Sequence, residues 1–153
     1  AFGGKRDIME MLAPQGPVYQ AGTLSGNPVA MTAGLATLDI ITQAGFYEPI
    51  MTATKKLADG LADAAKRCGI PLTCNHAGTM FGFFFTGEDK VENYQQVMAC
   101  NGERFNQFFH RMLDAGVYLA PAAYEAGFVS AAHNDEIIEE TLAIAERVMQ
   151  TLD

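Results

Sequence analysis

The segment at residues 79–86 constrains the fold most, because both of its faces are apolar. It carries two alternating apolar sets, Phe81, Phe83 and Phe85 on one side and Met80, Gly82 and Phe84 on the other. A strand with one wet face would carry polar residues at every second position, so this strand should be covered on both faces. The pattern predicts a sheet with helices on one face and another domain on the other. A ligand groove is the less favoured alternative, because core packing is the usual role of such a run.

Helical and extended patterns alternate on either side of this strand. Hydrophobic residues repeat with a helical period in several segments, and glycine or asparagine residues end or cap them. We expect helices at 28–42, 47–68, 93–99 and 103–114, a final helix capped by Asn134 or a neighbour, and strands at 71–75, 79–86, 117–120 and 128–130. The helices at 93–99 and 103–114 could run together. Short strands packed by helices predict an α/β fold class, as a small domain of the α+β type.

The same periodicity predicts which side chains are buried. Leu35, Leu38 and Ile41 share one face of the helix at 28–42 with several small residues, so this helix should be well buried. In the helix at 103–114, Leu113 falls on the apolar stripe. The final helix should bury an apolar side made of Ile138, Leu142, Ala145, Val148 or Met149, and Leu152.

Composition excludes several classes of function. The 153 residues are 49% hydrophobic and 18% charged, as in a globular protein, and carry a net charge of −8. This charge would repel nucleic acid and anionic membranes, so neither is an expected partner. The longest uncharged stretch, residues 11–38, is interrupted by prolines and polar residues, which argues against a membrane span.

The cysteines and histidines suggest no metal site. Three cysteines without a C-x-x-C pair indicate neither a disulfide framework nor zinc, and they fit a reducing cytoplasm. His76, His110 and His133 are scattered without metal-ligand spacing. We expect surface or capping roles for these histidines.

The loop at residues 19–28 has the composition of an anion-binding turn. Gly22 and Gly26 allow close backbone approach, Thr23 offers a hydroxyl donor, and Asn27 followed by proline forms a helix start. Phosphate is the anion that such a loop most often binds. A purely structural strand-to-helix turn would need the same residues, so local chemistry leaves both readings open.

This loop, the preceding AFGGKRDIM at 1–9, and the later LAP at 119–121 and YEAGF at 124–128 resemble the glutamate-1-semialdehyde 2,1-aminomutase family. That family belongs to the class III aminotransferase group of pyridoxal-phosphate enzymes, and the resemblance covers the whole chain. It implies the C-terminal part of a fold type I pyridoxal-phosphate-dependent transferase. Residues 1–45 would be a remnant of the large cofactor-binding domain, including the phosphate loop at 19–28. Residues 46–153 would be the small C-terminal α/β domain, and composition shifts near Gly45.

The resemblance also implies specific roles. Gly22 and Thr23 match positions that contact the phosphate of pyridoxal 5'-phosphate bound by the partner subunit of a homodimer. Glu125 matches a carboxylate that holds an amino group of the substrate, glutamate-1-semialdehyde, on its way to 5-aminolevulinate. The lysine that forms the Schiff base would precede residue 1, so Lys5 is not assigned that role. No catalytic residue is therefore expected in this chain, which should be inactive alone.

Two alternatives remain at this point. An ω-aminotransferase of the same class would typically carry a histidine before the Gly-x-Thr of the phosphate loop and an arginine near the C-terminal substrate site. Here Ala21 precedes Gly22, and residues 116–133 contain no arginine, which favours the aminomutase. The second alternative, a non-enzymatic α/β interaction module, conflicts with the strand that is apolar on both faces.

Overall fold

The computed structural model describes residues 2–152. It divides into two compact units, Ala1–Thr42 and Gln43–Asp153, which we call the N-terminal unit and the C-terminal unit. The division falls close to the composition shift near Gly45. Each unit is described by itself.

The N-terminal unit contains two helices joined by turns. Helix α1 spans Arg6–Met9, and helix α2 spans Pro28–Ile41. The Oδ1 atom of Asn27 accepts hydrogen bonds from the N–H groups of Val29 at 3.0 Å and Ala30 at 3.2 Å. The predicted helix start at Asn27 is therefore confirmed, because this side chain satisfies two of the N–H groups that a helix leaves unpaired.

The expected burial of α2 is wrong for this chain. None of its residues is buried, and Leu35 and Leu38 are 60% and 52% exposed. A helix face is buried only when another element covers it, and no element of the described N-terminal unit covers this one. The helix is apolar on most of its surface, so its sequence pattern did not indicate which side would be covered.

The C-terminal unit is built on a three-stranded antiparallel sheet in the order β1-β2-β3. Its strands are β1 at Thr73–Ala77, β2 at Met80–Phe84 and β3 at Gly127–Phe128. Gly78, with φ of 59°, lies in the turn between β1 and β2, where a positive φ favours glycine. In register, Asn75 pairs with Gly82 and Met80 pairs with Phe128.

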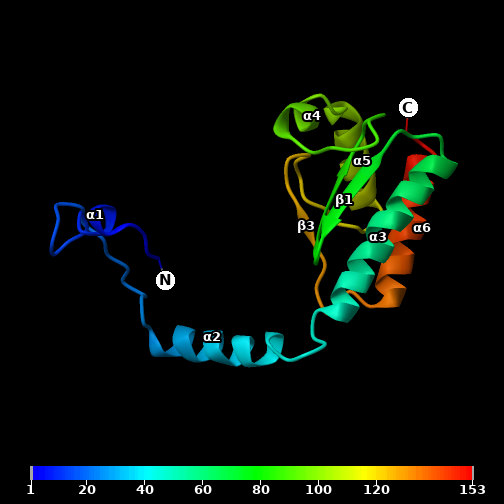
Figure 1. The fold of residues 1–153 in the computed structure, drawn as a ribbon. Coiled ribbons are helices and arrows are strands. Elements are labelled where there is room, and N and C mark those ends of the chain that lie inside the picture. The colour runs from blue at the N-terminus through cyan, green and yellow to red at the C-terminus, as the bar shows by residue number, and fades with distance from the viewer. Residues whose placement is uncertain (1, 153) are drawn as a thin grey trace. The chain divides into compact units, whose positions relative to one another are not determined.

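Four helices complete this unit: α3 at Glu48–Arg67, α4 at Tyr94–Met98, α5 at Gly102–Asp114 and α6 at Asp135–Met149. Helices α3 and α6 run side by side, and α3 also contacts the sheet (Figure 1). Asn134 caps α6 as predicted, with its Oδ1 accepting from the N–H of Ile137 at 3.0 Å. No helix within residues 2–152 is long and apolar enough to cross a membrane. The small α/β fold expected from the sequence is confirmed.

An aromatic cluster joins the sheet to α5. The ring of Phe108, which is fully buried, lies 5.5 Å from the ring of Phe83 and 5.5 Å from that of Phe85, both nearly edge to face. Phe83 also stacks on Phe105 with ring centroids 5.6 Å apart. The other face of the sheet is more open, because Met80 is 41% exposed. The domain expected to cover that face remains a prediction.

Three local expectations are wrong. Residues 117–120 form no strand, because the N–H of Val117 bonds back to the carbonyl of Met112 in the C-terminal turn of α5. Helices α4 and α5 are separate, since Asn101 caps α5 through the N–H of Arg104 and donates its own N–H to the carbonyl of Phe85. Leu113 is 43% exposed, at the edge of its stripe.

Candidate functional site

The predicted phosphate loop forms a closed turn in the N-terminal unit. The N–H of Ser25 donates to the carbonyl of Gly22 at 3.0 Å, and the N–H of Asn27 donates to that of Leu24 at 3.1 Å. A Cβ atom added to Gly22 would lie 2.3 Å from the Oγ of Ser25. A side chain at position 22 would therefore require the Ser25 hydroxyl to rotate away, and Gly26 adopts a positive φ of 72° at the end of the turn.

Two hydroxyl groups on this turn, those of Thr23 and Ser25, can donate to a ligand. Thr23 is exposed, and neither its hydroxyl nor its N–H has a hydrogen-bond partner among residues 2–152. The first N–H groups of α2 are less available, since the side chain of Asn27 already accepts from two of them. A hydroxyl and an N–H on a glycine turn fit a phosphate group. The residues at hand therefore suit the phosphate of a cofactor, with the turn rather than the helix end supplying the donors.

A cavity of about 350 Å³ lies in the C-terminal unit, beside the second predicted site residue, Glu125. Its walls come from β2, β3, α5, α6 and the irregular segment at residues 117–126. Within that segment, the N–H of Glu125 donates to the carbonyl of Ala122 at 3.1 Å, which makes a tight turn after Pro121. Glu125 itself is exposed. The carboxylate thus borders a mainly apolar cavity from a loop that has no strand partner.

The polar side chains around this cavity carry no permanent positive charge. Its lining includes Tyr118, Glu125, His133 and Thr141, and it contains no lysine or arginine. A carboxylate beside apolar walls attracts a cationic group more strongly than it would in open water. The cavity is therefore suited to an ammonium group on an otherwise small, partly apolar molecule.

A second groove of about 350 Å³ lies on the other side of the same segment. Tyr94 and Tyr124 line it, with ring centroids 6.4 Å apart, together with Met80 and Phe84 from the open face of the sheet. Glu125 borders this groove as well as the cavity. Movement of the loop that carries Glu125 would thus change both hollows together.

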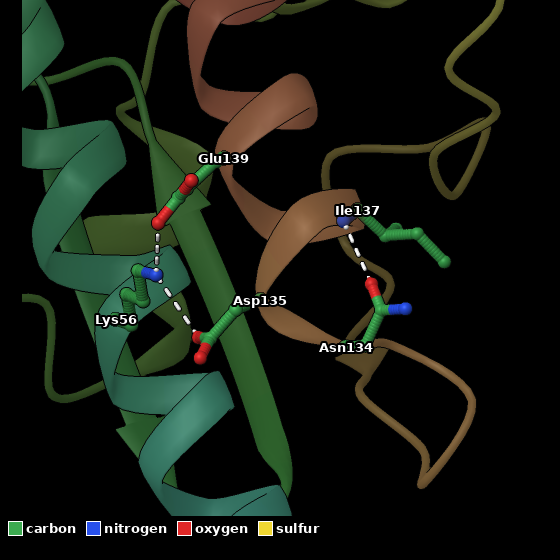
Figure 2. Close-up of polar contacts among 5 residues, drawn as sticks. All are labelled: Lys56, Asn134, Asp135, Ile137 and Glu139. Carbon is green, nitrogen blue, oxygen red and sulfur yellow. Dashed lines mark hydrogen bonds and ion pairs between the residues drawn. The ribbon is translucent and has the colours of Figure 1, made fainter.

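The start of α6 forms one wall of the cavity, and ion pairs between side chains join it to α3. The Nζ atom of Lys56 lies 2.9 Å from Asp135 and 2.8 Å from Glu139, and Asn134 caps the same turn (Figure 2). Hydrogen bonds from Lys56 to Glu139 and Asp135 raise the pKa of its ammonium group. These ion pairs are solvent-exposed, so each contributes little to the free energy of folding. Their main effect is to align α3 with α6.

The structure does not bring the predicted site residues into one described place. Gly22 and Thr23 belong to the N-terminal unit, whereas Glu125 belongs to the C-terminal unit. Lys5 is exposed and directly precedes α1. One contact was missed from the sequence: His133 accepts a hydrogen bond from Ser130 beside the cavity. The available signal was a serine three residues before a histidine that directly precedes a helix cap.

Comparison with known proteins gives a consistent family. The family model described as aminotransferase class-III matches residues 1–144. Among solved structures, an omega-transaminase from Sphaerobacter thermophilus is 20% identical with a TM-score of 0.73, over 97% of this chain and 34% of that one. The FumI protein of Sphingopyxis sp. MTA144, in its PLP internal aldimine form, is 26% identical with a TM-score of 0.68, over 86% of this chain and 29% of that one.

A third solved structure is that of an enzyme named for the activity expected from the sequence. A glutamate-1-semialdehyde-aminomutase from Pseudomonas aeruginosa PAO1 is 16% identical with a TM-score of 0.66, over 93% of this chain and 32% of that one. At such identities the match to this aminomutase and to the omega-transaminase shows the fold alone. The chain spans about a third of the length of these structures.

Proposed function

The chain belongs to the class-III aminotransferase family, and we propose that it is the C-terminal part of a glutamate-1-semialdehyde 2,1-aminomutase. The full-length enzyme would convert glutamate-1-semialdehyde to 5-aminolevulinate with pyridoxal 5'-phosphate. It would work as a homodimer, with the active site at the subunit interface. The support comes from the sequence motifs at 1–9, 19–28 and 119–128, and from the cavity beside Glu125.

Gly22 and Thr23 would hold the phosphate of the cofactor bound by the partner subunit. Gly22 leaves room beside it for the Ser25 hydroxyl, which a Cβ at position 22 would displace. Thr23 would donate its hydroxyl and N–H to phosphate oxygens, since both are unpaired within residues 2–152. In this role the turn binds and orients; it transfers no proton.

Glu125 would hold the amino group of the substrate at the mouth of the cavity. A carboxylate beside apolar walls stabilises an ammonium ion and orients it, and no lysine or arginine of the cavity competes for that carboxylate. When bound, the cofactor supplies the electron sink on which the amino group changes carbon atoms. The chain itself would thus bind and position two charged groups: the negative phosphate of the cofactor and the positive amino group of the substrate.

The absence of a cation from the cavity lining carries the choice of aminomutase over aminotransferase. An enzyme that exchanges amino acids with a second substrate must bind the carboxylate of each in turn, and arginine is the usual partner for a carboxylate. Residues 116–133 contain no arginine. Glutamate-1-semialdehyde also carries a carboxylate, but an aminomutase moves the amino group within that one molecule, so no second substrate carboxylate has to be bound near Glu125.

An ω-aminotransferase is the second candidate, and the mainly apolar lining of the cavity supports it. In such an enzyme the apolar walls of the cavity would accept the carbon chain of an amine. Glu125 would then face the amine without a second substrate carboxylate beside it.

Turnover of the purified full-length protein separates the two candidates. The aminomutase should form 5-aminolevulinate from glutamate-1-semialdehyde with no added amino acceptor, whereas an aminotransferase should require a 2-oxo acid. Glu125→Gln should raise the KM for glutamate-1-semialdehyde about tenfold, since it removes a charge-assisted contact. Glu140→Gln, on the exposed side of α6, is the matched control and should leave KM unchanged. Strict dependence on an amino acceptor would overturn the aminomutase assignment.

A further inference from the structure

The turn between β3 and α6 is held together by one histidine. The Nδ1 atom of His133 lies 3.0 Å from the backbone nitrogen of Ser130 and 3.0 Å from its Oγ. The N–H of His133 in turn donates to the carbonyl of Ser130 at 3.0 Å. Three hydrogen bonds thus join the same two residues. The turn they form leads directly to Asn134, the cap of α6.

These contacts fix the protonation state of the imidazole. A backbone N–H can only donate, so Nδ1 must be the acceptor and carries no proton. The Ser130 hydroxyl can then also donate to it, and the remaining ring proton resides on Nε2. A protonated imidazole has N–H groups at both nitrogens. Protonation would therefore break the bond from the N–H of Ser130, whereas the Ser130 hydroxyl can turn and accept from Nδ1 instead.

The turn joins two walls of the cavity that Glu125 borders. Gly127, Phe128 and Val129 line the cavity immediately before it; His133, Ile138 and Thr141 line it from the turn onward. Val129 is buried, and its N–H donates to the carbonyl of Thr79 at 2.9 Å. The wall before the turn is therefore anchored to the sheet. The position of the wall after it depends on the angle at which the turn leads into α6.

The charged groups around His133 are few. Glu125 and the phenol of Tyr118 border the cavity beside it, Asp135 follows in the first turn of α6, and Lys56 of α3 pairs with Asp135. Within residues 2–152, the hydrogen-bond partner of the His133 side chain is Ser130.

We propose that His133 is a positioning residue for the substrate site: its neutral imidazole, by accepting from Ser130, sets the angle at which α6 closes the cavity beside Glu125. This rests on the proposed function, in which that cavity receives the amino-bearing end of the substrate. The residue acts through the turn and touches no reacting atom. Substrate binding should then weaken when the acceptor at position 133 is removed.

Two substitutions at position 133 separate the acceptor from the ring. Asparagine places its Oδ1 close to where the histidine Nδ1 lies, so His133→Asn keeps an acceptor for Ser130 but cannot be protonated near neutral pH. His133→Phe keeps a ring and loses the acceptor. His110→Phe is the matched control, because His110 is exposed on α5 and lines neither hollow.

The first readout is amide hydrogen exchange over residues 129–138 in the full-length holoenzyme at pH 8. His133→Asn and His110→Phe should keep the wild-type protection, whereas His133→Phe should lose about fivefold. Wild-type protection in His133→Phe, or the same loss in His133→Asn as in His133→Phe, would overturn the proposal.

The second readout is the KM for the amino substrate relative to kcat. At pH 8 the KM of His133→Phe should be about fivefold above that of wild type and of His133→Asn, with kcat similar in all three. An unchanged KM in His133→Phe would overturn the positioning role. Hydrogen exchange requires no turnover, so failure to convert glutamate-1-semialdehyde would count against the proposed function while the exchange comparison still judges the role of His133.

Discussion

Replacing Phe108 by alanine should remove the contact that fixes the sheet to α5. Phe108 is fully buried and meets the rings of Phe83 and Phe85 at 5.5 Å each, nearly edge to face. Truncating a buried phenylalanine costs about 3–5 kcal/mol, which includes the cavity left behind. We therefore expect Phe108→Ala to lower the free energy of unfolding by about 4 kcal/mol.

Two further variants divide this loss into its causes. Phe108→Leu keeps most of the apolar volume but loses both aromatic pairs, worth about 0.5–1.5 kcal/mol each, so it should cost about 1–3 kcal/mol. Phe128→Ala is the matched control: Phe128 is 67% exposed, and its truncation should cost about 1 kcal/mol or less.

Urea unfolding of the 153-residue chain, followed by far-ultraviolet circular dichroism, measures all three values. The order of stability should be wild type, Phe128→Ala, Phe108→Leu and Phe108→Ala. If Phe108→Ala lost no more than Phe128→Ala, the aromatic cluster would not be the contact that holds the sheet to α5. If Phe108→Leu lost as much free energy of unfolding as Phe108→Ala, the stabilisation would come from the aromatic ring contacts rather than from the buried volume.

Two other predictions follow from close packing and from burial. Gly127→Ala should lower the free energy of unfolding by about 1–3 kcal/mol, because its new Cβ would lie 2.5 Å from the buried ring of Phe81; an unchanged urea midpoint would contradict the tight contact. Burial, with a smaller effect of Asp59, raises the pKa of the Cys74 thiol to about 12. At pH 8 its thiolate should be about a thousandfold scarcer than that of a thiol with pKa 9.0, and its alkylation rate should rise about tenfold per pH unit. Peptide mass spectrometry measures the alkylation of Cys74. Rapid alkylation whose rate does not depend on pH would refute this prediction.

Features that depend on neighbouring residues were predictable from the sequence. Asn27 and Asn134 were identified as caps because a cap needs only a side-chain oxygen and the next few N–H groups. The strand with Phe81, Phe83 and Phe85 was found because its period of two is carried by the residues themselves. The helix periods were read for the same reason.

Features that depend on a distant partner were not. Burial of Leu35 in α2 requires an element that the described N-terminal unit does not supply. Residues 117–120 have a strand-like composition, but the C-terminal turn of α5 claims the N–H of Val117 before a strand could pair with it. The division between α4 and α5 depends on Asn101 reaching the carbonyl of Phe85, sixteen positions earlier.

The candidate site was predictable only through motifs. Gly22, Thr23 and Glu125 were chosen by resemblance, and their roles remain predictions. The fold adds what the motifs could not give: the close approach of the Ser25 hydroxyl to Gly22, and the cavity without a lysine or arginine beside Glu125. The contact between Ser130 and His133 was missed, because a histidine alone has no directional signal in a sequence.

Retention of pyridoxal 5'-phosphate by the full-length dimer tests the account most directly. Thr23→Ala removes one charge-assisted hydrogen bond to phosphate, worth about 1.5–3 kcal/mol, so the cofactor should dissociate about 10- to 150-fold more readily. Thr32→Ala is the matched control, because the Thr32 hydroxyl donates to the carbonyl of Pro28 within α2. Weaker retention in Thr23→Ala with wild-type retention in Thr32→Ala is the predicted result. Equal cofactor affinity in both variants and wild type would contradict the phosphate role of the loop.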